Sequence, residues 1–309
     1  MQWNNKKVLI TGGCGFIGPK LAMKLLEKNA DITILDNFSD INKINMNKII
    51  EDCKIVKGNI LDKKSLEKID KNISYVFHFG APSSIILFNK DPNLRVHETI
   101  CGFLNIMGWV KEIGIDKLVY PSSGSVYGNV PPPQSENISP KPVNLYGICK
   151  LTTEHIAKNY SDYVPSVGLR IFAGYGPGEE HKGDYASVVT LFLESIIKGE
   201  SPIIYGDGTQ GRDFVYIDNV IDAIVASAEK NIKDEVINVG SGKRYSFNDI
   251  INIINHKLNK NIKPKYVNRP INYLENTLAD ITKMKKMLDI FPMDLEEGIE
   301  KYLEVKNIL

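Results

Sequence analysis

The sequence predicts an α/β fold, a doubly wound parallel sheet with a smaller C-terminal α/β lobe. Short apolar runs alternate with helical patterns from residue 8 onward, and this order is typical of a parallel sheet covered by helices. The first run enters a helix through a glycine-rich turn. The length, 309 residues, is enough for a large core with an added lobe.

The first predicted strand is Val8–Ile10, which has two β-branched residues and suits a fully buried parallel strand. A helical pattern follows over 16–28. The turn between them contains Gly12, Gly15 and Gly18. Such a turn directs backbone N–H groups and the positive end of the helix at one point, which suits a pyrophosphate. A glycine turn without a ligand is the alternative for this motif taken alone.

The bulk properties narrow the function classes. The net charge is +1, which gives no argument for binding to nucleic acid or to an anionic membrane. We find no export signal and no run of apolar residues long enough for a membrane span. The four cysteines form no C-x-x-C motif and favour reduced thiols in a cytoplasmic protein. The histidines lack metal-like spacing to acids or thiols, so we predict no metal.

A second buried strand, Asp31–Asp36, ends in a carboxylate eighteen residues after Gly18. A carboxylate at this place can accept both hydroxyls of an adenosine ribose and would repel a 2′-phosphate. The predicted cofactor is therefore NAD rather than NADP. The alternative is an aspartate that only caps the next turn.

Further strands are expected at 55–56 and 75–79, and a long helix at 93–113. In this helix we expect one apolar side made of Leu94, Ile100 or Cys101, Leu104, Met107 or Gly108, and Val110 or Lys111. His78 lies inside the apolar strand, so we interpret it as a packed, hydrogen-bonded core residue rather than a base.

A strand at 118–120 leads to Ser123, and a helix opens near Asn144 and runs to about Tyr160. Within it, Tyr146 and Lys150 are four residues apart and therefore share one helix face. An ammonium beside a phenol favours the phenolate, as would the positive nicotinamide, so both would lower the pKa of the phenol. This makes Tyr146 a candidate general base. A chance pair on the helix surface is the alternative. Ser123 at the end of the preceding strand favours catalysis.

In this order, the motifs resemble the extended short-chain dehydrogenase/reductase family, and within it the NAD-dependent nucleotide-sugar epimerases and dehydratases. The motifs that carry the resemblance are Gly12-x-x-Gly15-x-x-Gly18, Asp36, Ser123, Tyr146-x-x-x-Lys150, Leu169–Phe172, Tyr175–Pro177, Tyr205–Asp218, Ile237–Gly242 and Arg269-Pro270. They cover nearly the whole chain. The resemblance implies a Rossmann fold, bound NAD, a nucleotide-sugar substrate and a homodimer formed through helices near 94–113 and 146–160.

The resemblance also implies roles for single residues. Ser123 would hydrogen-bond the reacting sugar hydroxyl, Tyr146 would take its proton, and Lys150 would hold the nicotinamide ribose. The substrate would also contact Ser125, Ala173, Arg212 and Arg269, with the two arginines on its diphosphate. NAD would contact Gly12, Gly15, Phe16, Ile17, Gly18, Asp36, Asn37, Asn59, Ile60, Phe79, Gly80 and Ala81, together with Tyr146 and Lys150. A surface ion pair is the alternative for the arginines, but the chain has only five. Arg170 is a candidate structural residue.

The reaction is suggested by two positions after Ser123. Dehydratases of the family have an acid and a base there, whereas this chain has Gly124 and Ser125. We therefore expect 4-epimerisation, most simply of UDP-glucose and UDP-galactose. A reductase, dehydrogenase or dehydratase on the same scaffold is an alternative, and a non-catalytic NAD-sensing module is another.

The sequence differs from the family pattern at three places, and these differences bear on which nucleotide base and which sugar the substrate contains. They are Ala173 in place of an asparagine, Asn59 in place of an aspartate, and a charged insert at 178–185. The insert is most simply a solvated loop, although it could recognise an unusual sugar.

We expect an NAD-binding domain of residues 1–172, to which 213–239 returns, and a nucleotide-sugar lobe of 173–212 and 240–309. The strand and helix near 214–229, with 236–239, would return to the main sheet. The substrate would lie between the lobes, because clefts at domain interfaces commonly bind ligands.

Overall fold

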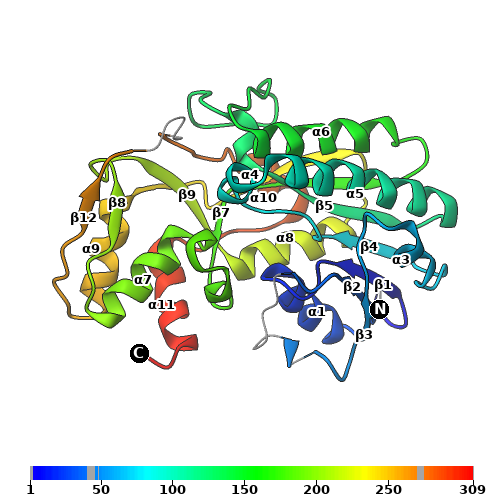
Figure 1. The fold of residues 1–309 in the computed structure, drawn as a ribbon, viewed down its shortest axis with the longest axis horizontal. Helices are drawn as coiled ribbons and strands as arrows, with labels where there is room; N and C mark the ends of the chain where they lie inside the picture. Colours follow the sequence, from blue (N-terminus) through cyan, green and yellow to red (C-terminus); the bar gives the residue numbers. More distant parts are fainter. Residues whose placement is uncertain (1–2, 40–45, 48, 270–274, 309) are drawn as a thin grey trace.

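The computed structural model describes residues 3–39, 46–47, 49–269 and 275–308, so Pro270 of the Arg269-Pro270 motif lies outside the described residues. Figure 1 shows a helix-covered sheet beside a smaller lobe made of later segments. The large sheet has seven parallel strands in the order β10-β6-β5-β4-β1-β2-β3. The predicted doubly wound α/β fold is therefore confirmed.

The strands of this sheet are β1 (Lys7–Thr11), β2 (Asp31–Asp36), β3 (Lys54–Lys57), β4 (Tyr75–His78), β5 (Lys117–Ser123), β6 (Ser166–Ile171) and β10 (Glu235–Val239). The helices associated with this part are α1 (Ile17–Leu26), α3 (Lys63–Glu67), α4 (Ile85–Lys90), α5 (Pro92–Ile113), α6 (Leu145–Asn159), α8 (Ile217–Glu229) and α10 (Thr282–Leu288).

Strand β1 shows why the sheet is covered on both faces. Successive side chains of a strand point to opposite faces. Val8 and Ile10 belong to the core that includes Leu21 of α1, and Leu9 belongs to the core that includes Phe103 of α5. All three β1 residues are fully buried, so an apolar run without alternation is the expected sequence of this strand.

The predicted apolar side of α5 was wrong in part. Phe103 and Met107 are buried, but Leu94 and Leu104 are each 40% exposed. The helix packs inward through a different set of residues, which includes Gly102 against Ile60. A second apolar stripe therefore remains on the surface, beside α6.

In its described residues, the smaller lobe contains two small sheets and three α-helices. One sheet has the order β11-β9-β7 and the other pairs β12 with β8. The strands are β7 (Ala173–Tyr175), β8 (Ile203–Tyr205), β9 (Gly211–Tyr216), β11 (Arg244–Ser246) and β12 (Lys265–Val267), and the helices are α7 (Val188–Lys198), α9 (Phe247–Lys257) and α11 (Leu295–Val305).

The expectation that the strand near Phe214 returns to the main sheet was wrong. This strand, β9, pairs with β7 and β11, whereas β10 occupies the place beside β6. Asp213 fixes β9 there, since its carboxylate accepts the N–H groups of Ser241 (2.6 Å), Gly242 (2.9 Å) and Ala279 (3.0 Å). The chain rejoins the main sheet with α8 and β10.

Among the described residues, none of the helices combines the length and the apolar character needed to cross a bilayer.

Candidate active site

The candidate site lies at the carboxyl ends of the parallel strands. β1 stands between β4 and β2, so the chain leaves β1 towards one edge of the sheet and later returns on the other side. Ligands of open α/β sheets bind at such a switch point. The loops after β1, β2, β3 and β4 all open at this edge because the four strands are parallel neighbours.

The glycine turn after β1 has no space for side chains at two of its motif positions. Gly12 has φ +69°, and a Cβ there would lie 2.5 Å from the Gly80 nitrogen. A Cβ at Gly18 would lie 2.4 Å from the Gly13 Cα. Glycine is required for the turn at the first position and for the close approach of α1 at the second.

The same turn can bind an anion. Phe16 is the N-cap of α1 and makes no side-chain cap, and the first turn of the helix contains no acid. Its N–H groups and the positive end of the helix are therefore suited to a phosphate. Asp36 orients the loop, because its carboxylate accepts the N–H groups of Cys14 (2.9 Å) and Phe38 (2.7 Å). The residues fit a dinucleotide.

The remaining predicted cofactor residues lie along the same edge. Asn37 follows β2 and is exposed, and Phe79 with Ala81 follows β4. After β3, the Asn59 side chain accepts the Leu61 N–H at 2.9 Å. Ile60 is buried. Gly15 and Ile17 belong to the turn and the first turn of α1. Their contacts with NAD stay a prediction.

Ser123, Tyr146 and Lys150 come together where β5 ends and α6 begins. The Ser123 hydroxyl accepts the Ser125 N–H at 3.1 Å and hydrogen-bonds Tyr146. Lys150 Nζ lies 5.8 Å from the centroid of the Tyr146 ring, as the four-residue spacing predicts. Phe88 of α4 packs edge-on against Tyr146, with ring centroids 5.6 Å apart. Ser123, Lys150 and Phe88 therefore all lie beside the Tyr146 side chain.

Burial dominates the electrostatics of this group. Burial lowers the pKa of Lys150 to about 8. Burial also raises the pKa of Tyr146 above its ordinary value, and the hydrogen bond with Ser123 opposes the rise. In the protein alone the Tyr146 pKa is therefore raised, because loss of hydration disfavours the phenolate more than the Ser123 hydrogen bond favours it. The lowering expected from Lys150 together with the nicotinamide stays a prediction.

His78 is confirmed as a packed, hydrogen-bonded core residue. Its side chain is buried, and Nδ1 lies 2.8 Å from Thr11 Oγ1. Burial and the nearby Lys150 lower the His78 pKa to about 3. The imidazole is therefore neutral at neutral pH and is a poor proton acceptor.

A buried polar network beneath Ser123 was missed by the sequence analysis. Glu154 accepts two hydrogen bonds from Arg170, at 2.9 Å from Nε and 2.7 Å from Nη2, and one from Ser122. The Arg170 Nη1 group donates to Tyr127 at 2.8 Å. Glu154 is four residues beyond Lys150, and this spacing on one helix face was visible in the sequence. Arg170 is structural here.

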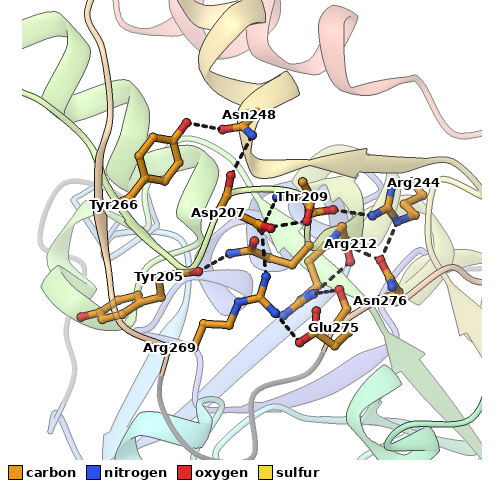
Figure 2. A network of polar contacts seen from close by, with 12 residues as sticks. Tyr205, Asp207, Thr209, Arg212, Arg244, Asn248, Tyr266, Arg269, Glu275 and Asn276 are labelled. Carbon is orange, nitrogen blue, oxygen red and sulfur yellow. Dashed lines mark hydrogen bonds and ion pairs between the residues drawn. The ribbon is translucent and has the colours of Figure 1, made fainter.

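The predicted substrate arginines lie together in the smaller lobe (Figure 2). Arg269 forms ion pairs with Asp207 (2.9 Å) and Glu275 (2.5 Å). Arg212 Nη1 donates to the backbone carbonyls of Gly211 and Glu275, each at 2.9 Å. Both guanidinium groups therefore meet at Glu275, and Arg269 shows the ion pairing that was its alternative.

Arg244 also belongs to this group, although the sequence analysis assigned it no role. It donates to Asn276 Oδ1 (2.7 Å) and to the Thr209 carbonyl (2.6 Å). It therefore ties β11 to the segments that flank Arg212. Arg95 forms an ion pair with Glu98 within α5.

Ser125 and Ala173 lie just beyond the ends of β5 and β6. Ser125 is part of the short 3-10 helix Gly124–Tyr127, and Ala173 opens β7. Between them, Phe172 fills the space above Gly124, since a Cβ at Gly124 would lie 3.1 Å from the Phe172 ring.

The insert 178–185 is not simply a solvated loop. Asp184 is exposed, but Glu179 is 1% exposed and accepts hydrogen bonds from Thr190 Oγ1 (2.5 Å) and the Ser187 N–H (3.0 Å). Burial raises the Glu179 pKa. The segment is therefore built around an internal carboxylate.

No three or more His, Cys, Asp or Glu side chains form a group that could hold a metal ion within the part of the chain that the structure describes.

Comparison with known sequences gives a family. Residues 8–240 match the NAD dependent epimerase/dehydratase family. A Methanocaldococcus jannaschii protein with a provisional assignment as a UDP-glucose 4-epimerase is 34% identical, over 97% of this chain and 98% of its own length. The UDP-N-acetyl-alpha-D-glucosaminuronate decarboxylase of Bacillus cytotoxicus is 29% identical, over 98% of this chain and 99% of its own.

Solved structures of UDP-sugar 4-epimerases have the same fold as this chain. The UDP-glucose 4-epimerase of Thermotoga maritima with UDP-glucose has a TM-score of 0.92 and 30% identity, over 97% of this chain and 98% of that one. The UDP-glucuronic acid 4-epimerase of Bacillus cereus, in complex with UDP-glucuronic acid and NAD, has a TM-score of 0.86 and 29% identity, over 98% and 100% of the two chains.

The Glu154–Arg170 ion pair predicts a large loss of stability when one partner is removed. In Arg170→Met, the buried Glu154 charge loses its compensation, so the free energy of unfolding should fall by about 3 to 5 kcal/mol. Urea denaturation measures this change. Glu154→Gln together with Arg170→Met should lose less than the two single changes combined. A single variant within about 0.5 kcal/mol of the wild type would contradict the role of the pair.

The buried Lys150 predicts a pH-dependent stability of definite sign. Its folded-state pKa of about 8 is below its ordinary 10.5, so the folded protein releases the proton first and is stabilised as the pH rises from about 8 towards 10.5. Between about pH 7 and pH 9, the wild type should gain about 1 kcal/mol relative to Lys150→Met. Urea denaturation at both pH values tests this. The exposed Lys158→Met should follow the wild type; equal profiles for all three proteins would refute the prediction.

Proposed function

The chain belongs to the NAD dependent epimerase/dehydratase family, and from this premise we propose that it is a UDP-sugar 4-epimerase, most simply one that interconverts UDP-glucose and UDP-galactose. The observation that carries the proposal is the group of Ser123, Tyr146 and Lys150 at the end of β5, followed by Gly124 and Ser125, which have no acidic or basic side chain.

The protein's own residues would act on the proton of the sugar hydroxyl. Ser123 orients the C4 hydroxyl by a hydrogen bond, and Tyr146 in its phenolate form accepts the hydroxyl proton and later returns it. Lys150 holds a positive charge beside the phenol at neutral pH, since its pKa is about 8. When bound, NAD supplies the acceptor and then the donor of the hydride that leaves and re-enters at C4.

The raised Tyr146 pKa indicates what Lys150 would do in this reaction. Burial makes the phenolate unfavourable, and only the phenolate can accept a proton. Ionisation of Tyr146 therefore needs positive charge close to the phenol oxygen. Lys150 supplies that charge from the same helix face, and Ser123 supplies a hydrogen bond. Removal of the lysine charge should therefore slow the proton transfer more than it weakens substrate binding.

The surroundings of Gly124 argue against elimination of water. An acidic side chain at this position would enter the space of the Phe172 ring, only 3.1 Å from the first added atom. Ser125 has a hydroxyl, which is a poor acid or base near neutral pH. Oxidation at C4 and reduction on the other face need only Ser123, Tyr146 and Lys150.

Arg212 and Arg269 are proposed to bind the substrate diphosphate. Guanidinium groups bind phosphate through paired N–H donors, and both groups face Glu275. A diphosphate would compete with Asp207 and Glu275 for Arg269. Because the substrate would be held by its nucleotide end, the sugar could turn over without leaving the site.

The names of the relatives indicate other nucleotide sugars that should be tested as substrates. One relative is named as a decarboxylase of a UDP-linked uronic acid, and a solved structure is a UDP-glucuronic acid 4-epimerase. A reductase or dehydrogenase would make or consume reduced nicotinamide in proportion to product. A non-catalytic NAD sensor would leave all the sugars unchanged.

Tyr146→Phe tests the function directly. Purified protein is incubated with UDP-glucose, UDP-galactose, UDP-glucuronate and GDP-, CDP- and dTDP-sugars, and the products are separated by chromatography. We expect wild-type protein to interconvert UDP-glucose and UDP-galactose without net change in reduced nicotinamide. Tyr146→Phe should lower kcat by about 10² to 10⁴ because the proton acceptor is lost.

Tyr163→Phe is the matched control, since this tyrosine is 61% exposed and should keep wild-type activity. Equal inactivity of wild type and Tyr146→Phe on the whole panel would favour the sensor. Product that accumulates together with reduced nicotinamide would favour the dehydrogenase.

We also propose that the enzyme is a homodimer formed through α5 and α6. The two helices pack together and lie side by side along one edge of the molecule in Figure 1. They expose Leu94, Leu104, Leu145 and Ile148, each 40% to 45% exposed. Leu145 also shares a shallow surface hollow with Val96 and Ile100 of α5. A second copy of the chain would cover this apolar stripe.

Leu104→Glu with Ile148→Glu should convert the dimer to a monomer, because two charges would be buried in an apolar contact. Light scattering coupled to size-exclusion chromatography measures the mass. Ile203→Glu is the control, since Ile203 is 54% exposed on β8 of the other lobe and should leave the dimer intact. A wild-type protein that elutes as a monomer at all concentrations would rule out this interface.

A further inference from the structure

A short helix of the larger lobe packs against Tyr146, the proposed general base. Helix α4 contains Phe88, whose side chain is 1% exposed. The Phe88 ring lies edge-on to the Tyr146 ring, with centroids 5.6 Å apart and planes at 63°. Within the described residues, no other aromatic ring packs on Tyr146. Helices α4 and α6 are in contact, and Figure 1 shows α4 beside the start of α6.

The backbone of Tyr146 is fixed, but the position of its hydroxyl depends on neighbouring side chains. Asn144 caps α6 by accepting the Gly147 N–H at 2.9 Å. A Cβ at Gly147 would lie 2.6 Å from a carbonyl oxygen of the short 3-10 helix after β5, so the first turn of α6 is closely packed. Rotation about the Cα–Cβ bond of Tyr146 would still move the phenol oxygen. The hydrogen bond with Ser123 and the ring of Phe88 restrict that rotation.

Helix α4 is held at both ends, so Phe88 is a firm neighbour. Ser84 caps the start of the helix by accepting a backbone N–H at 3.2 Å. At the other end, Lys90 donates to the Tyr185 hydroxyl at 2.8 Å, and Tyr185 belongs to the insert 178–185. Phe88 lies between these two attachments. A contact between the lobes therefore supports the helix that packs on Tyr146.

Phe88 also affects the hydration of the phenol. In the described part of the chain, the other groups that face the phenol are Ser123 of β5 and Lys150 of α6, of which only Lys150 can carry a charge near neutral pH. The uncharged Phe88 ring covers one side and excludes water there. A proton acceptor must stay within hydrogen-bond reach of the proton it takes, and a small misplacement of reacting groups lowers the rate strongly.

We propose that Phe88 is a positioning residue that acts through Tyr146. Its ring holds the phenol in one orientation towards the sugar hydroxyl and keeps water from that side of the phenol. This inference rests on the proposed function, because it depends on Tyr146 as the proton acceptor. It does not depend on which nucleotide sugar is the substrate.

Phe88→Ala tests the orientation through the enzyme rate. The kcat for interconversion of UDP-glucose and UDP-galactose should fall about tenfold to a hundredfold, because the phenol loses its fixed position. The KM should stay within about twofold of the wild type, since the nucleotide end of the substrate would be bound by the other lobe. Phe88→Leu keeps apolar bulk without a flat ring and should lower kcat about threefold. This second variant carries the test if Phe88→Ala does not fold.

Trp3→Leu is the matched control. Trp3 is 2% exposed, and its ring also packs on a tyrosine, with centroids 4.8 Å apart. That tyrosine is Tyr75, which opens β4 at the amino end of the parallel sheet, opposite the site. Trp3→Leu should lower the free energy of unfolding, as Phe88→Leu does, but it should leave kcat unchanged.

A measurement without substrate separates this inference from the proposed function. Protein labelled with ¹³C at the tyrosine Cζ atoms is titrated by NMR, and the Tyr146 signal is the one that Tyr146→Phe removes. Phe88→Ala, and to a smaller extent Phe88→Leu, should lower the Tyr146 pKa towards its ordinary value of 10.0, because water then reaches the phenol. Trp3→Leu should leave this pKa unchanged.

The inference is overturned if the Phe88 variants keep the wild-type kcat, if KM rises as much as kcat falls, or if Trp3→Leu slows the reaction equally. An unchanged Tyr146 pKa in the Phe88 variants also overturns it, whatever the activity. A wild-type protein that converts none of the sugars would instead contradict the proposed function.

Discussion

The site depends on a cation that is buried against a neutral partner. Lys150 is 3% exposed, and its ammonium donates to the Pro121 carbonyl at 3.2 Å. A carboxylate in that place would stabilise the charge, but it would also cancel its effect on Tyr146. With a carbonyl partner, the positive charge would remain available to the proposed general base, Tyr146. Burial lowers the pKa of Lys150 to about 8, so most of the lysine is still charged at neutral pH.

Helix α6 contains the Lys150 charge beside Tyr146 and also a second buried charge, Glu154, whose contacts are structural. Tyr146, Lys150 and Glu154 follow at intervals of four and share one face. Arg170 and Ser122 fix Glu154 to β6 and β5, so these buried contacts hold the helix in position. Lys150, one turn earlier, is then oriented without an ion pair of its own. A buried pair is weak evidence for net stability, but here it explains how one helix can position a phenol and an ammonium.

The sequence predicted the parts of the fold and site that local patterns determine. The buried strand, glycine turn and helix around Gly12, and the spacing of Tyr146 and Lys150, depend on residues close in the chain. The place of β9 was not predictable, because Asp213 is fixed by N–H groups from Ser241 and Ala279. The raised Tyr146 pKa of the protein alone was not predictable for a related reason. Burial by distant segments outweighs the neighbour visible in the sequence.

The chain has few arginines, so their positions indicate which lobe would bind the phosphate groups of the proposed ligands. Three of the five arginines in the sequence, Arg212, Arg244 and Arg269, gather in the smaller lobe, as Figure 2 shows. That lobe would then bind the diphosphate of the proposed substrate, while the sheet edge provides Ser123 and Tyr146. Strong contacts then fall on the parts of the ligands that do not react. The hexose between them would be bound mainly by hydrogen bonds, which is what a sugar that must present both faces of C4 requires.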